Sequence, residues 1–280
     1  MHAIILTAGE GARLGSWTSN RPKGMIPIGN RPILDYLVRG IVNSGVKKIN
    51  MVVGYSKNSV MSYFGDGSSF GAKISYFFQE KRTGTLEAMR IGMSDDISDF
   101  ILVPGDNYVS SDSFSKLRAA NGLALLSGKA DRWSKWGEIE LEKGKPKITF
   151  DSPEAYQRIH FTGIAKLNSE TADELINSSG KHIGEALESI LPKNDFEVIE
   201  SEHWHNIVYP WDLISGNRVA FIDNQLYRNG KIERNVTIKG EVSIGKGTII
   251  RSGTYLIGPI SIGDSCDIGP NSVIGPSVSL

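Results

Sequence analysis

A glycine-rich turn near the N-terminus carries the residues best suited to bind phosphate. The hydrophobic run 3–6 is followed by Gly9 and Gly11, and then by two cations, Arg13 and Lys23. Glycine lets a backbone turn tightly and bring its N–H groups close to an anion, while guanidinium and ammonium groups supply the opposing charge. The pattern is therefore typical of a phosphate-binding loop.

This turn is neither of the two commonest glycine-rich motifs. Leu14 stands where a dinucleotide-binding fingerprint has its third glycine, and no Gly-Lys-Ser/Thr of a nucleotide P-loop lies nearby. A plain junction between a strand and a turn is the alternative for so short a segment. Arg21, Pro22 and Pro27 extend the pattern and favour the binding loop.

A second stretch with chemical potential ends at Asp106. The hydrophobic run 101–104 is followed by Gly105, Asp106 and Asn107. A carboxylate at the end of a strand, freed by a preceding glycine, is well placed to hold Mg²⁺ against phosphate oxygens. The alternative is a turn-forming Asp-Asn pair, which is common in loops.

Alternating strand and helix patterns position these two stretches. The predicted strands are 2–7, 49–54, 73–79 and 100–103, and the predicted helices are 33–44, 86–93, 182–191 and 211–222. Alternation of this kind favours an α/β fold, a Rossmann-like mixed but mostly parallel sheet with helices on both faces. Ligands of such sheets bind at the carboxyl ends of the strands. Gly9 and Asp106 each follow a strand, so we expect them to meet there.

Length and composition exclude several classes of protein. The 280 residues suffice for one large domain and a smaller module, and their net charge is zero, without a run of basic residues that would indicate nucleic-acid or membrane binding. No apolar run is long enough for a transmembrane helix, and the start of the chain lacks the basic region of a signal peptide. Cys266 is the single cysteine, so no internal disulfide forms. A cytoplasmic location is the simplest expectation.

The tail of the chain is a repeat with a period of six residues. Aliphatic residues recur at six-residue intervals at the following positions: Ile238, Ile244, Ile250, Leu256, Ile262, Ile268, Ile274 and Leu280. Such periodicity is typical of a left-handed parallel β-helix, in which three hexads complete one coil. The tail would hold about two and a half coils. Because the repeat stops in mid-turn, we expect either that the natural chain continues or that another subunit covers this end.

The N-terminal motifs resemble those of a known family. Residues 6–14 (LTAGEGARL), 21–28 (RPKGMIPI) and 30–34 (NRPIL) resemble the signature of the sugar-1-phosphate nucleotidylyltransferases, above all the archaeal-type glucose-1-phosphate thymidylyltransferases and N-acetylglucosamine-1-phosphate uridylyltransferases. The resemblance implies transfer of a nucleotidyl group from UTP or dTTP to a sugar-1-phosphate, with release of pyrophosphate. Arg13 and Lys23 would then be catalytic residues that stabilise charge on the phosphates.

The resemblance also assigns nucleotide-binding residues. In the family a glutamine, followed a few residues later by Gly-Thr, reads the pyrimidine base, and Gln79, Gly84 and Thr85 match this pattern. Ala8 stands where relatives that use purine nucleotides more often have a glycine, which favours UTP or dTTP. The full nucleotide-binding set is Leu6, Ala8, Gly9, Gly11, Gln79, Gly84 and Thr85. Without the resemblance, residues 79–85 would be a turn in which Thr83 or Thr85 caps the following helix.

The sugar side matches the family less completely. Gly137 and Thr162 match sugar-binding positions, and Asp151 stands for a family glutamate. Ser152 replaces a lysine that contacts the sugar phosphate in the family, and Arg158 or His160 could compensate. Asp212, in the segment 209–214, matches the second ligand of Mg²⁺ beside Asp106. Alone, Asp212 would be a first-turn acid that complements a helix dipole.

Two other functions stay open on the sequence. A hexapeptide acyltransferase would need a histidine base in the tail, yet no histidine follows His205. A non-catalytic, regulatory relative is the other alternative, and whether Asp106 and Asp212 reach one metal ion would discriminate it. We expect a nucleotidylyltransferase domain at 1–225 and a β-helix at 226–280. The expected partners are UTP or dTTP and a sugar-1-phosphate, in a homo-oligomer without nucleic acid or membrane.

Overall fold

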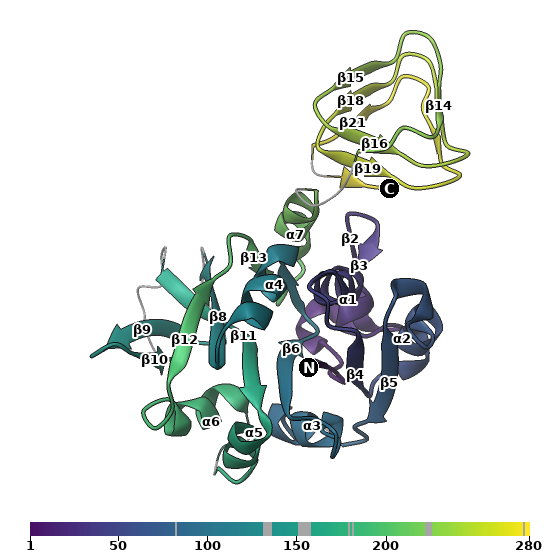
Figure 1. Ribbon diagram of the computed structural model, residues 1–280. Helices are drawn as coiled ribbons and strands as arrows, with labels where there is room; N and C mark the ends of the chain where they lie inside the picture. The colour runs from purple at the N-terminus through teal and green to yellow at the C-terminus, as the bar shows by residue number, and fades with distance from the viewer. Residues whose placement is uncertain are drawn as a thin grey trace. The chain divides into compact units, whose positions relative to one another are not determined.

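The computed structural model describes residues 1–81, 83–130, 136–150, 158–178, 180, 182–221, 226–276 and 278–280. They form two compact units (Figure 1). The first consists of Met1–Ile26 and Ile33–Val208, and the second of Pro27–Pro32 and Tyr209–Leu280. The boundary that the sequence predicts after residue 225 falls at the edge of a segment outside the described residues, and it stays a prediction.

A nine-stranded mixed sheet is the centre of the first unit, as the α/β pattern predicted. Its main path runs β10-β9-β11-β6-β1-β4-β5, with β8 beside β11 and β12 beside β8. The strands are β1 (His2–Thr7), β4 (Lys48–Val53), β5 (Lys73–Phe78), β6 (Asp99–Pro104), β8 (Leu123–Ala130), β9 (Glu138–Glu142), β10 (Lys145–Thr149), β11 (Arg158–Asn168) and β12 (Phe196–Glu200). β6, β1, β4 and β5 are parallel, so their carboxyl ends share one edge of the sheet.

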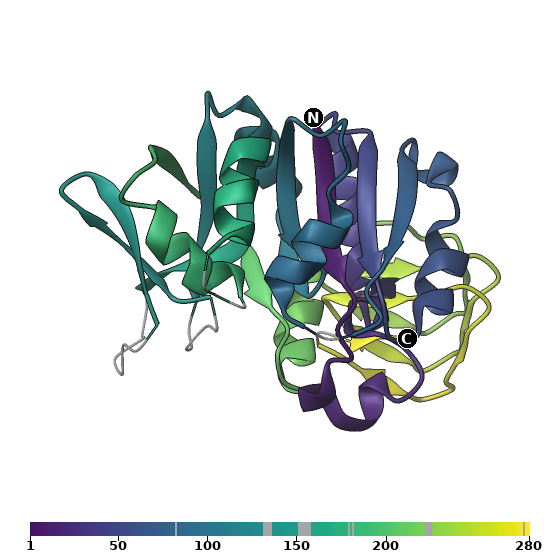
Figure 2. The same ribbon diagram turned by 90° about the horizontal axis from the view of Figure 1, so that it is seen from below.

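Helices cover both faces of this sheet. They are α1 (Ile33–Asn43), α2 (Lys57–Phe64), α3 (Thr85–Gly92), α4 (Ser111–Ala119), α5 (Ser169–Ile176) and α6 (Ile183–Ile190). Figures 1 and 2 show α3, α5 and α6 on one face and α1 and α4 on the other. Ala3, Ile4 and Ile5 are fully buried between these layers, which explains why β1 is apolar on successive positions rather than alternate ones.

Short elements surround the edge where the parallel strands end. The 3₁₀ helices η1 (Ala12–Thr18) and η2 (Lys23–Met25) lie here, and β7 (Asn107–Val109) pairs with β13 (Trp204–Asn206). A third 3₁₀ helix, η3 (Ser68–Phe70), precedes β5 and lies at its amino end. In Figure 2 the purple chain leaves β1 at the lower edge of the sheet and enters η1 there. Both predicted phosphate-binding and metal-binding stretches therefore lie at this edge.

The second unit contains a hairpin, a helix and a three-sided parallel β-helix. Its elements are β2 (Pro27–Ile28), β3 (Arg31–Pro32), α7 (Asp212–Ala220), β14 (Lys231–Ile232), β15 (Thr237–Lys239), β16 (Val242–Ile244), β17 (Ile249–Ile250), β18 (Tyr255–Ile257), β19 (Ile260–Ile262), β20 (Asp267–Ile268), β21 (Val273–Ile274) and β22 (Val278–Ser279). The three sides are β14-β17-β20, β15-β18-β21 and β16-β19-β22.

The six-residue period of the tail is confirmed by the register of these sheets. Ile238 pairs with Leu256, and Leu256 pairs with Ile274, so the positions that stack on one another are 18 residues apart. Three hexads thus complete one coil. Ile244 and Ile262 stack in the same way on a second side, and both are fully buried.

The hairpin β2–β3 belongs to the second unit although it comes from the N-terminal signature. The Asn30 amide Nδ2 donates to the carbonyl oxygens of Ser261 and Leu280, both at 2.9 Å. The Gly29 N–H donates to Asn217 Oδ1 of α7 at 2.8 Å. These bonds fix residues 27–32 to α7 and to the last coil, a pairing across more than 180 positions that local sequence patterns do not reveal.

Removal of the Leu256 side chain should destabilise the β-helix strongly. Leu256→Ala is expected to lower the free energy of unfolding of this unit by about 2–5 kcal/mol, because Leu256 is fully buried and its loss leaves a cavity between stacked coils. Hydrogen exchange of the β18 amides, followed by mass spectrometry, measures this. Val273→Ala, on the adjacent strand, is the control, since Val273 is 74% exposed. Equal protection in both variants would contradict the assignment of Leu256 to the core.

Candidate active site

A cavity of about 530 Å³ lies within the first unit, at the carboxyl ends of β1 and β6. It is lined by Leu6, Thr7, Ala8, Gly9, Gly11, Ala12, Arg13, Lys23, Gly24, Gln79, Gly84, Thr85, Ala88, Pro104, Gly105, Asp106, Trp136, His182 and Val208. The structure therefore brings together most of the residues that the sequence analysis selected. Gly137, Thr162 and Asp212 are not in this lining, and Asp151 is outside the described residues.

The glycine-rich loop forms one wall of the cavity. Gly11 has a φ of +72°, and a Cβ atom there would lie 2.8 Å from the Lys23 Cβ, so glycine is required by both backbone conformation and space. A Cβ at Gly9 would meet nothing within 4 Å. The loop thus packs closely against Lys23 and leaves room over Gly9 for a ligand to approach the backbone.

Lys23 and Asp106 form an ion pair at the floor of the cavity. Lys23 Nζ lies 2.9 Å from Asp106 Oδ2, and their side chains are only 12% and 15% exposed. Two glycines make this approach close: a Cβ at Gly24 would lie 2.8 Å from the Gly105 carbonyl oxygen. Asp106 is therefore held beside a cation in a cavity that phosphate groups could enter. A residue that only forms a turn would not need this ion pair.

The segment from Gln79 to Thr85 forms the wall beyond β1. Gln79 Nε2 donates to the Gly84 carbonyl at 3.1 Å, which orients the amide and leaves its Oε1 in position to accept a hydrogen bond. The alternative that Thr83 or Thr85 caps α3 is wrong, because the N-cap is Gly84, without a side-chain bond. Thr85 Oγ1 instead accepts from the Ile183 N–H at 2.9 Å and joins α3 to α6.

A further side of the cavity is formed by residues that were not assigned to the site from the sequence. Trp136, which precedes β9, is 5% exposed and packs edge-on against Phe161, with ring centroids 6.2 Å apart. His182, which precedes α6, and Val208, which follows β13, complete this side. A lone histidine and a lone valine carry no sequence pattern, so only the folded arrangement identifies them.

The predicted sugar-binding residues lie near this side or outside the described chain. Gly137 follows the cavity residue Trp136, and its φ of +80° and the closeness of Ile148 require glycine. Thr162 is fully buried, and its hydroxyl donates to the Leu126 carbonyl at 2.8 Å inside the sheet. Asp151 and Ser152 lie outside the described residues. Thr162 thus has a structural hydrogen bond, whereas Gly137 supports the cavity wall.

Neither residue expected to compensate for the missing lysine lines the cavity. Arg158 donates to both carboxylate oxygens of Glu138, at 2.9 and 3.1 Å. His160 is 2% exposed, and burial is the main cause that holds its pKa below the ordinary value of 6.5. His160 is therefore neutral at pH 7 and does not supply a cation for phosphate binding.

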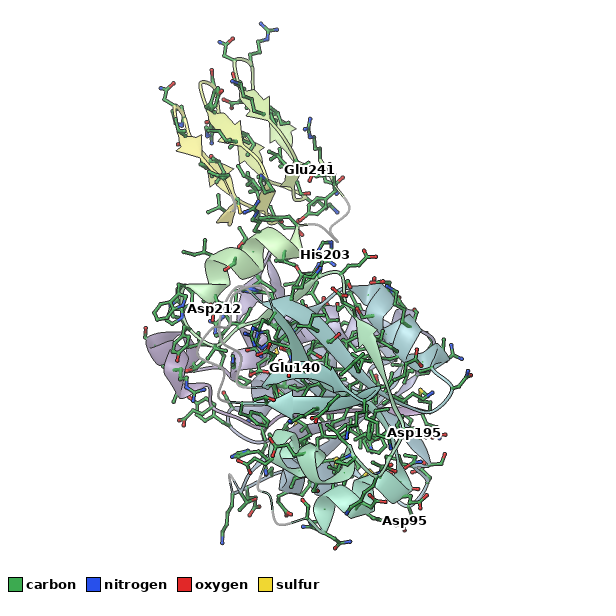
Figure 3. The ribbon with its side chains drawn as sticks, turned by 90° about the vertical axis from the view of Figure 1, so that its left-hand side faces the viewer. Asp95, Glu140, Asp195, His203, Asp212 and Glu241 are labelled. Atoms are coloured by element: carbon green, nitrogen blue, oxygen red, sulfur yellow. The ribbon has the colours of Figure 1, made fainter. Side chains whose placement is uncertain are left out.

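Asp212 belongs to the second unit. Figure 3 shows it at the beginning of α7, where its Oδ2 accepts from the Tyr209 N–H at 2.7 Å. Such a bond, from a backbone N–H just before a helix to a carboxylate in its first turn, is typical of an acidic residue that stabilises the start of the helix. No cluster of three or more His, Cys, Asp or Glu side chains suited to a metal occurs in the part of the chain that the structure describes.

Asp106 nevertheless fits one requirement of a Mg²⁺ site. Mg²⁺ in nucleotide-dependent enzymes is commonly held by one or two carboxylates together with substrate phosphates, rather than by a complete cage of protein ligands. A single carboxylate in a cavity beside Arg13 and Lys23 agrees with that donor set.

Among the described residues, no helix has the length and apolar composition that crossing a bilayer requires.

Comparison with known proteins identifies the family to which the chain belongs. The family model described as "Nucleotidyl transferase" matches residues 2–150, more than half of the chain. The chain belongs to the nucleotidyl transferase family. A second model, "Bacterial transferase hexapeptide (six repeats)", matches residues 241–276 of this nucleotidyl transferase, within the β-helix.

Named relatives agree with this membership. The bifunctional protein GlmU of Methanococcus maripaludis (strain C7) is 34% identical over 262 residues, which cover 90% of this chain and 62% of the relative. Glucose-1-phosphate thymidylyltransferase of Streptomyces griseus is 26% identical, over the whole chain and 82% of the relative. The chain thus spans less than two thirds of the length of the GlmU relative.

A solved structure supports the fold. A protein of Bacillus anthracis, described provisionally as a glucose-1-phosphate thymidylyltransferase and solved with sucrose, superimposes with a TM-score of 0.72. The match covers 81% of this chain and 98% of the other, at 20% sequence identity. The mixed sheet predicted from the alternating pattern is therefore that of a known nucleotidyl transferase fold.

Proposed function

We propose that the protein transfers a nucleotidyl group from UTP or dTTP to a sugar-1-phosphate, either glucose-1-phosphate or N-acetylglucosamine-1-phosphate. The observation that carries this proposal is the cavity in which the glycine-rich loop, the Lys23–Asp106 pair and the Gln79–Gly84 pair meet. Family membership and the names of the relatives support the same reaction class.

The proposed reaction needs no protein nucleophile. A phosphate oxygen of the sugar-1-phosphate attacks the α-phosphorus of the nucleotide, a new P–O bond forms, and the bond to the β-phosphate oxygen breaks in line as pyrophosphate leaves. Arg13 and Lys23 stabilise the charge that the transferring and leaving phosphates carry. The backbone N–H groups at Gly9 and Gly11 hold the triphosphate in place.

Asp106 is the proposed ligand of Mg²⁺, and Asp212 stays the proposed second ligand. The ion, when bound, supplies a Lewis acid that neutralises phosphate charge and templates nucleotide and acceptor. Asp106 also holds Lys23 in the cavity through its ion pair at 2.9 Å. A cytoplasmic location and a homo-oligomeric state belong to the same proposal, and Gly137, Asp151 and Thr162 stay the proposed sugar-binding set.

Base selection follows from the orientation of Gln79. Since Gln79 Nε2 donates to the Gly84 carbonyl, Oε1 is the atom that can accept from a base. Uracil and thymine carry an N–H at position 3, whereas cytosine has an acceptor there. We therefore expect kcat/KM for UTP or dTTP to exceed that for CTP by about tenfold or more, as for other single buried hydrogen bonds to a substrate. Initial rates with each nucleotide measure this, and equal values would contradict the assignment.

Release of pyrophosphate is the test of the whole proposal. The purified chain is incubated with UTP, dTTP, CTP, ATP or GTP, each with Mg²⁺ and a panel of sugar-1-phosphates, and pyrophosphate is measured by a coupled assay. We expect release that requires both a sugar-1-phosphate and Mg²⁺. If no combination of nucleotide and sugar-1-phosphate in the panel releases pyrophosphate, the alternative of a non-catalytic, regulatory relative replaces the proposal.

A further inference from the structure

The cavity has few positive charges for the ligands proposed to enter it. Arg13, Lys23 and His182 are the side chains that can carry positive charge among the described residues of the lining. Asp106 already neutralises Lys23 at 2.9 Å. Each terminal phosphate of the substrates carries about two negative charges at neutral pH, so every donor in the lining matters.

His182 lies where the two halves of the site meet. Its neighbour Ile183 donates its N–H to Thr85 Oγ1 of α3 at 2.9 Å, and the His182 carbonyl accepts from the Ala186 N–H at 3.1 Å. These two bonds fix the backbone on either side of the His182 side chain. The imidazole is exposed and borders the cavity.

The position of α6 places His182 at the border between the base-binding residue Thr85 and the part of the sheet that contains β9, β10 and β11. The proposed base-binding residues come from β1, β5 and α3, on the β1-β4-β5 half of the sheet. α6 packs against α5 and β10, and β10 ends the sheet path beyond β9, β11 and β6. Trp136, which precedes β9, borders the cavity on this same half.

We propose that His182 contacts the acceptor substrate, the sugar-1-phosphate, and that its imidazole N–H donates a hydrogen bond to a phosphate oxygen of that substrate. This inference rests on the proposed function and adds a specificity residue to it. Imidazole presents an N–H donor in both its neutral and its charged form, so the contact does not depend on protonation.

Steady-state kinetics of the full chain test the contact. His182→Ala is expected to raise KM for the sugar-1-phosphate about tenfold, which is the loss for one hydrogen bond to a charged group, and to leave KM for the nucleotide within twofold. His182→Gln keeps an N–H donor and should recover part of the affinity. His203→Ala is the matched control, because His203, labelled in Figure 3, is not in the lining and should leave both KM values unchanged.

A second measurement keeps this inference separable from the proposed function. The chain has five histidines, so a spectrum of protein labelled with ¹³C-histidine is simple, and His182→Gln assigns the His182 signal. Addition of glucose-1-phosphate should shift that signal, and addition of glucose should not.

Each combination of results decides the matter. If the enzyme turns over and His182→Ala leaves KM for the sugar-1-phosphate unchanged, or raises both KM values equally, the inference is wrong and the function stands. If nothing turns over but glucose-1-phosphate shifts the His182 signal, the contact stands without the function. If neither turnover nor a shift occurs, both are overturned.

Discussion

Asp106→Asn is expected to lower kcat about thousandfold, with the chain still folded. The substitution keeps the shape of the side chain and removes the negative charge that is proposed to hold Mg²⁺ against the phosphates, an electrostatic contribution of several kcal/mol to the transition state. Pyrophosphate release at saturating substrates and varied Mg²⁺ measures the effect. Wild-type turnover in this variant would rule out Asp106 as a metal ligand.

Asp99→Asn is the matched control for this experiment. Asp99 begins β6, the strand that Asp106 follows, so it lies at the opposite edge of the sheet. It is exposed, and its loss should leave both activity and stability unchanged within error. A comparable loss of activity in Asp99→Asn would show that the effect of Asp106→Asn comes from the sheet and not from the cavity.

Lys23→Met is expected to lower kcat about a hundredfold or more. The ammonium group borders the cavity and is proposed to stabilise the leaving pyrophosphate, and methionine replaces it with an apolar side chain of similar length. Pre-steady-state measurement of pyrophosphate release separates this step from product dissociation. Lys48→Met, at the start of β4 and 60% exposed, is the control that should retain full activity.

The two substitutions together distinguish catalysis from stability. Each single variant breaks this mostly buried ion pair and keeps one of its two charges, so each should lower the melting temperature. The double variant Lys23→Met/Asp106→Asn removes both charges, and we expect its stability to return towards that of the wild type while activity stays lost. Recovery of activity in the double variant would mean that the pair is structural alone.

Features that depend on local patterns could be predicted from the sequence. The buried run of β1, the glycine-rich loop after it and the alternation of strands and helices gave the α/β class, because each is encoded within a few consecutive residues. The six-residue period gave the β-helix for the same reason, since every coil repeats the same local requirement. Loop residues of the cavity followed from their position after these strands.

Features that depend on distant contacts could not be predicted. Thr85 looked like a helix cap, yet its hydroxyl accepts from Ile183, 98 positions along the chain. His182 and Trp136 enter the cavity only because the sheet places β11 beside β6 and β9 beside β11, an order that local periodicity does not specify. The assignment of residues 27–32 to the second unit likewise depends on bonds from Asn30 to Ser261 and Leu280.

The hairpin β2–β3 limits how this protein can be divided or recombined. The chain passes from the first unit into the second after Ile26, returns after Pro32 and leaves again after Val208, so three peptide connections join the units. A cut at residue 208 would separate the β-helix from the hairpin strands to which Ser261 and Leu280 bond. Exchange of the tail between family members, in evolution or by engineering, would therefore have to carry residues 27–32 along as a second, compatible insertion.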